Sequence, residues 1–153
     1  MPDAIVETWN IHQRINLYLL EALQDEVLTA SPGRTGRNIG EQWHHISKVR
    51  LMWLKQSAPE LIEGADEPDK SIAGDKNALR SFLEQTGALI EQLLEKGLAE
   101  GKIKGFKPHP TAFLGYLIAH ESHHRGQIAL LARQLGHPLD KKTAFGLWEW
   151  GVR

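Results

Sequence analysis

The spacing of apolar residues along the chain predicts four long helices separated by breaks. The first helix covers residues 3–28, and one face of it carries apolar side chains at steps of four or six: Ile5, Trp9, Ile15, Leu19, Leu23 and Val27. The sequence Ser-Pro-Gly at positions 31–33 ends this pattern, because proline and glycine both interrupt helices.

Polar residues mark the beginnings of the next two predicted helices. Asn38 is the expected N-cap of a helix that continues to residue 56, with Glu41 three residues later as in a capping box. Asp75 is the expected N-cap of a third helix that continues to residue 98. Between these helices, residues 57–74 contain two prolines and two glycines, which predicts a long irregular connection.

A fourth helix is predicted from Pro110 to Leu135. Proline is tolerated in a first helical turn, and Gly136 and Pro138 stop the pattern at the other end. Each of the four helices carries an apolar stripe that needs partners to cover it. The expected fold class is therefore an all-α four-helix bundle, in which residues 1–153 form a single domain.

The lengths of the connections predict the order of the helices. The breaks near residues 30–37 and 100–108 are short, which favours antiparallel neighbours. The long connection of 18 residues can span about 60 Å when extended, whereas a helix of about 19 residues is only about 28 Å long. It can therefore return along the bundle and leave the second and third helices parallel, in an up-down-down-up order. The tail is expected to pack on the bundle through Trp148 and Trp150.

Composition and charge exclude several classes of protein. The 153 residues are 41% hydrophobic and 24% charged with a net charge of −1, so neither disorder nor nucleic-acid binding is expected. No apolar run approaches the ~20 residues that span a bilayer, and no basic segment with a following apolar stretch predicts a secretory signal. The absence of cysteine excludes thiolate ligands and a cysteine nucleophile, and it is compatible with a cytoplasmic location.

Histidines are the candidate ligands for a metal ion. His120 and His124 are four residues apart on the inward stripe of the fourth helix, a spacing that lets two imidazoles bind one ion. On the second helix, His45 lies at the core boundary and His44 on a solvated face, so His45 is the expected third ligand and His44 the alternative. Three imidazoles leave coordination positions open, as in catalytic zinc sites.

Two other interpretations of these histidines remain open. The residues from His120 to His124 also satisfy the H-E-x-x-H pattern of zinc peptidases, in which Glu121 would activate water. The longer form of that pattern fails, because Gln127 and Leu130 stand where it needs glycine and histidine. Alternatively, the histidines are hydrogen-bonded core groups of a non-catalytic helical module that dimerises.

The two histidine segments resemble the DinB/YfiT-like family of metal-dependent bundles. They are Ile-Gly-Glu-Gln-Trp-His-His-Ile at 39–46 and His-Glu-Ser-His-His-Arg-Gly-Gln-Ile at 120–128. In that family the ligand on the second helix precedes an apolar residue, as His45 precedes Ile46. The resemblance implies an up-down-down-up bundle, commonly a homodimer, in which His45, His120 and His124 bind zinc, nickel or a similar divalent ion.

The resemblance also implies a class of reaction. Some relatives transfer small thiols onto electrophiles or use a thiol in an isomerisation. We therefore expect a divalent-metal-dependent enzyme acting on a small molecule, either a thiol-dependent S-transferase or a hydrolase. Because this chain has no cysteine, a low-molecular-weight thiol would have to come from a cosubstrate.

Four further polar residues are candidates for the surroundings of the site. Gln42, one turn before His45, is expected to orient a ligand or to cap the edge of the core. His12 and Asn16, four residues apart on the first helix, either line the mouth of the pocket or form a polar patch that faces solvent. Glu121 lies about 100° from His120 around its helix, which favours a surface salt bridge over the role of general base.

Overall fold

The computed structural model describes residues 3–31, 33 and 35–153, and these residues form helices and no strand. The four long helices are α1 (Ala4–Ala22), α2 (Ile39–Ser57), α3 (Lys76–Glu100) and α4 (Pro110–Gln134). A short helix, α5 (Lys141–Gly146), follows, and four 3₁₀ turns complete the secondary structure: η1 (Asp25–Val27), η2 (Pro59–Ile62), η3 (Lys70–Gly74) and η4 (Trp150–Val152). The all-α prediction is confirmed.

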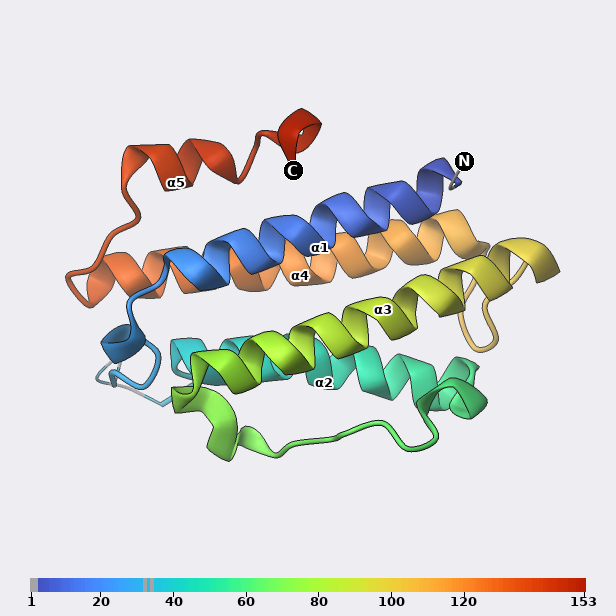
Figure 1. The fold of residues 1–153 in the computed structure, drawn as a ribbon, viewed down its shortest axis with the longest axis horizontal. Helices are drawn as coiled ribbons and strands as arrows, with labels where there is room; N and C mark the ends of the chain where they lie inside the picture. The colour runs from blue at the N-terminus through green and yellow to red at the C-terminus, as the bar shows by residue number, and fades with distance from the viewer. Residues whose placement is uncertain (1–2, 32, 34) are drawn as a thin grey trace.

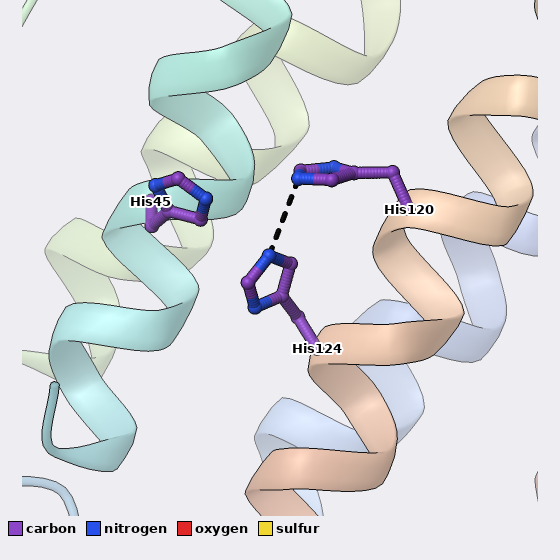
Figure 2. Close-up of side chains that lie close together, drawn as sticks. All are labelled: His45, His120 and His124. Carbon is purple, nitrogen blue, oxygen red and sulfur yellow. Dashed lines mark hydrogen bonds between the residues drawn. The ribbon is translucent and has the colours of Figure 1, made fainter. Parts of the chain in front are cut away.

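The long helices lie lengthwise beside one another (Figure 1). Helix α2 packs against α3 and α4, and α1 packs against the same two helices. Figures 1 and 2 agree that α2 and α4 form one layer and that α1 and α3 form the other. The connection between α2 and α3 runs along the outside of the helices (Figure 1). In the part of the chain that the structure describes, no helix combines the length and apolarity needed to cross a membrane.

Capping side chains fix where α2 and α3 begin, as the sequence predicts. The Asn38 side chain accepts a hydrogen bond from the Glu41 backbone N–H at 2.8 Å, and the Glu41 carboxylate accepts one from the Asn38 N–H at 3.1 Å. Asp75 accepts a hydrogen bond from the Ala78 N–H at 3.1 Å. These bonds satisfy N–H groups that a helix leaves without partners in its first turn.

The first helix ends earlier than predicted. It stops at Ala22 rather than at residue 28, because Leu23 adopts an extended conformation with ψ of 140°. The chain then turns, and Val27 and Leu28 become almost completely buried in the core. The ammonium group of Lys76 donates a hydrogen bond to the carbonyl oxygen of Leu23 at this turn. Periodicity alone could not locate this end, since Leu23 and Val27 are buried as a continued helix would bury them, although the chain is no longer α-helical there.

The C-terminal tail does not pack through Trp148 as predicted, because this side chain is 81% exposed. Trp150 is half-buried, and the η4 turn that it begins contacts α1. In this contact with α1, the Arg153 guanidinium lies 3.8 Å from the centre of the Tyr18 ring, and Arg14 donates a hydrogen bond to the Arg153 carbonyl oxygen. The small residue Gly146 allows the Tyr18 ring to approach the backbone of α5.

The apolar core has two halves with polar side chains between them. One half includes Trp9, Leu54, Ile90, Phe113 and Leu117, and the other includes Leu19, Trp43, Ile46, Leu83 and Ile128. Along each long helix, buried polar residues separate the two halves. We call this set the polar layer: His12, Gln13, Asn16, Arg50, Thr86 and Glu121.

An ion pair between Arg50 and Glu121 forms the centre of the polar layer. Arg50 Nε and Nη2 donate to the two carboxylate oxygens of Glu121 at 2.8 and 2.7 Å. Arg50 also donates to the Leu83 carbonyl oxygen on α3 at 3.0 Å and to Gln13 Oε1 on α1 at 2.7 Å. The guanidinium thus connects α2 to all three other long helices.

The Glu121 carboxylate accepts two more hydrogen bonds from α1. His12 Nε2 and Asn16 Nδ2 each lie 2.9 Å from Glu121 Oε1. Burial by itself would raise the pKa of Glu121, but the charge and hydrogen bonds of Arg50, together with His12, outweigh burial and hold this pKa far below its usual range. Burial lowers the pKa of His12, so the imidazole is neutral and donates its Nε2 proton to the carboxylate.

Replacing Glu121 with glutamine is expected to lower the free energy of unfolding by about 3–5 kcal/mol, because the Arg50 charge would remain buried without a counter-charge. Urea denaturation measures the loss. The control Glu84→Gln changes an exposed carboxylate on α3 and should alter stability little.

The double substitution Arg50→Met with Glu121→Leu should destabilise less than Glu121→Gln alone, because it leaves neither charge buried without its partner. A double variant that is less stable than Glu121→Gln would contradict this account of the ion pair.

Candidate metal centre

Three histidines from two helices converge in the layer formed by α2 and α4. His45 comes from the first half of α2, and His120 and His124 come from consecutive turns of α4. One ring nitrogen from each residue lies within 4.8 Å of the corresponding nitrogens of the other two. Figure 2 shows the His120 and His124 rings extending from α4 toward α2, where the His45 ring lies. The structure therefore brings together the three residues that the sequence singled out.

The distances within the cluster suit a shared ion. His120 Nε2 and His124 Nε2 are 3.2 Å apart, and nitrogen ligands at the usual zinc distance of about 2.1 Å are separated by about 3.4 Å in a tetrahedron. The His45 ring centre lies 4.7 Å from that of His124 and 5.6 Å from that of His120. The third imidazole is thus within reach of the same ion after a small adjustment of its side chain.

Two glutamines orient the His124 ring. His124 Nδ1 lies 2.7 Å from Gln42 Oε1 and 3.0 Å from Gln127 Oε1. Because both partners are carbonyl oxygens, Nδ1 carries the proton and donates it, which leaves the lone pair of Nε2 directed toward His120. Metal-binding histidines are commonly held in this way by an acceptor on their second nitrogen.

The environment keeps the three imidazoles neutral. Burial lowers the pKa of His45 to about 4, and the positive charge of Arg37 acts in the same direction. Burial and the neighbouring His120 lower the pKa of His124 to about 4. Burial also lowers the pKa of His120. A histidine must be neutral to bind a metal ion, so all three are in the required state at pH 7.

The donor set fits a divalent metal ion. Nδ1 of His120 is buried and has no hydrogen-bond partner among the described residues. Three neutral imidazoles, one of them held by amide acceptors, make a set typical of zinc, nickel and similar ions. Among the residues that the structure describes, no carboxylate belongs to the cluster, so a bound ion would keep its positive charge largely uncompensated by the protein.

The other predicted site residues do not surround the cluster, apart from Gln42. His12 and Asn16 neither line a pocket mouth nor face solvent, because both are completely buried in the polar layer. Glu121 does not form a surface salt bridge, since it is buried against Arg50. A rotation of about 100° from His120 points Glu121 into the core, because α4 is covered by other helices on that side.

The burial of Glu121 also removes the basis for a peptidase of the H-E-x-x-H type. Such an enzyme needs its glutamate beside the metal ion, where the carboxylate can activate water. Both oxygens of Glu121 instead accept hydrogen bonds from Arg50. The alternative ligand His44 also turns away, and its Nε2 donates to the Pro68 carbonyl oxygen at 2.8 Å.

A cavity of about 560 Å³ adjoins the cluster, and both glutamines and His124 contribute to its wall. Sequence reasoning assigned no role to Gln127, to Arg37 at this cavity or to Arg50 in the polar layer. Gln127 could have been found by its position three residues after His124, on the same helical face. Arg50 could have been found by its position four residues after the buried Ile46, in the apolar stripe of α2.

Comparisons with known proteins agree with the resemblance in the two histidine segments. YjoA, an uncharacterised protein of Bacillus subtilis (strain 168), is 26% identical over 144 residues, which cover 88% of this chain and 91% of the relative. No solved structure gives a significant match. The sequence model of the DinB family matches residues 1–144, nearly the whole chain, and this chain is therefore a member of the DinB family.

Proposed function

We propose that His45, His120 and His124 bind one divalent metal ion, zinc or nickel, and that the protein is a metal-dependent enzyme acting on a small molecule. The observation that carries this proposal is the convergence of three ligand nitrogens within 4.8 Å of one another. Membership of the DinB family is compatible with it. The hydrogen bonds from His124 to Gln42 and Gln127 support it further, because they direct one lone pair toward the other histidines.

The residues of the chain have distinct tasks in this proposal. His45, His120 and His124 would hold the ion, and three protein ligands would leave coordination positions open for water or substrate. When bound, the ion supplies Lewis acidity, which lowers the pKa of a coordinated water or thiol. Gln42 and Gln127 keep the His124 ring in its ligating orientation. Glu121 holds no proton for the reaction, because its carboxylate is fixed in the core.

We propose that this centre catalyses one of two reactions: the transfer of a low-molecular-weight thiol or a hydrolysis. The chain has no cysteine, so a thiol nucleophile would be a cosubstrate. The adjoining cavity of about 560 Å³ supports a small-molecule substrate, since ligand pockets commonly measure about 300–1,000 Å³.

We also propose the up-down-down-up helix order for this bundle. The course of the connection along the outside of α2 and α3 supports this order, because it lets α3 begin near the end of the bundle where α2 begins (Figure 1). In this order α2 and α4 are antiparallel. A homodimer and a cytoplasmic location stay predictions from the sequence.

The wild-type protein is expected to bind about one zinc or nickel ion per chain, measured by equilibrium dialysis and elemental analysis. The variants His45→Ala and His124→Ala should lose most of this binding, because two imidazoles rarely retain an ion that three hold. The matched controls His44→Ala and His123→Ala remove neighbouring imidazoles outside the cluster and should bind as the wild type does. A wild-type protein without bound metal would instead favour a non-catalytic helical module.

The variant Gln42→Leu is expected to weaken zinc binding by about 10–100-fold, because it removes one acceptor that orients His124. Competition with a zinc-binding dye measures the affinity. The variant Gln42→Glu retains an acceptor at this position and should bind zinc at least as well as the wild type. Equal affinities for the wild type and Gln42→Leu would show that Gln127 alone orients the ring.

The lowered pKa values predict the response of the metal-free protein to acid. In the unfolded chain a histidine protonates near pH 6.5, whereas His45 and His124 in the folded protein protonate near pH 4. Between these values the unfolded state binds more protons, so the free energy of unfolding should fall as the pH is lowered. Urea denaturation at pH 7 and pH 5 measures this loss.

The double variant His45→Gln with His124→Gln should lose less stability than the wild type over the same pH interval. The exposed His123 provides the control, since His123→Gln should lose as much as the wild type. An equal loss in the double variant and in the wild type would mean that the cluster histidines do not cause the acid sensitivity.

A further inference from the structure

The cavity beside the histidine cluster has a positively charged end. Arg37, in the loop before α2, lines the cavity, and it is exposed. Gln42 and His124 line the same cavity, so Arg37 shares a wall with one histidine of the candidate metal centre and with a glutamine that orients it. Arg37 therefore lies close to the candidate metal centre.

Nothing in the described part of the chain neutralises this charge. No carboxylate among residues 3–31, 33 and 35–153 forms an ion pair with Arg37, whereas Arg50, Arg80 and Arg153 each have an acidic partner. The described residues of the cavity wall include no aspartate or glutamate. A guanidinium and a metal centre on one cavity, without a nearby acid, favour an anionic ligand.

Another part of the wall is apolar. Leu130 and Leu131 of α4 line the cavity, and Leu130 is 45% exposed. The polar side chains of the described wall are those of Thr35, Arg37, Gln42, His123, His124 and Gln127. Arg37 is the one arginine or lysine among them, and a single guanidinium matches the single charge and the two oxygens of a carboxylate.

We propose that this cavity binds small carboxylates with an apolar group, held by Arg37 at the carboxylate and by Leu130 and Leu131 at the apolar end. The inference rests on the proposed function in one respect, since it makes such a carboxylate the substrate class of the metal centre. The preference for a carboxylate would come from Arg37, because the three histidines by themselves do not distinguish between anionic and neutral ligands.

The experiment is an NMR titration of zinc-loaded and metal-free protein with hexanoate and its neutral analogue hexanamide. Hexanoate is expected to bind about tenfold more tightly than hexanamide, because its carboxylate makes one charge-assisted hydrogen-bonded contact that the amide lacks. The variant Arg37→Gln should lose this preference, and Arg37→Lys should retain part of it. The variant Arg133→Gln removes an exposed charge elsewhere on α4 and should behave as the wild type does.

Further titrations test the apolar contact and the choice of carboxylate separately. The variant Leu130→Ser should weaken hexanoate binding without changing the weaker binding of acetate. Equal affinities for hexanoate and hexanamide, or a preference unchanged in Arg37→Gln, would overturn the proposal. Hexyl phosphate binding more tightly than hexanoate in an Arg37-dependent way would overturn the choice of carboxylate.

The metal-free arm distinguishes this proposal from the proposed function. A protein that binds zinc but does not prefer hexanoate retains the metal centre and loses the carboxylate site. A protein that binds no metal but prefers hexanoate through Arg37 retains the carboxylate site and loses the proposed metal chemistry.

Discussion

The carboxylate of Glu121 is completely buried, and its charge is compensated by groups from separate helices. Arg50 reaches it from α2, and His12 and Asn16 reach it from α1. Arg50 in turn binds a carbonyl oxygen on α3. A buried ion pair of this kind adds little net stability compared with apolar packing, but a wrong helix rotation would leave a charge without its partner. We infer that the pair selects one arrangement of the four long helices.

The polar layer and the histidine cluster are connected through α4. Glu121 follows His120 directly, and consecutive residues on a helix project about 100° apart. With Glu121 fixed in the core, His120 and His124 must face α2, where Gln42 Oε1 accepts a hydrogen bond from His124 Nδ1–H. The short sequence from His120 to His124 thus serves two purposes, a structural ion pair on one side and a ligand pair on the other.

Local features of the sequence predicted much of the structure. The caps at Asn38 and Asp75 are confirmed, because a capping side chain bonds to its own helix and needs no distant partner. Helical spacing brought His120 and His124 together for the same reason, since residues four apart share a face. The end of α1 and the exposed Trp148 were predicted wrongly, because burial of those residues depends on segments distant in the sequence.

By itself, the sequence determined the helical fold, the starts of the helices and the pair of histidines on α4, because periodicity and capping act over one or two turns. Only the tertiary structure decided that His45 meets this pair and that Glu121 lies against Arg50. It also decided that Gln127 is a second acceptor for the hydrogen bond from His124 Nδ1–H. These contacts join residues through the rotation and offset of whole helices. Packing of all four helices sets those quantities together, so no single segment encodes them.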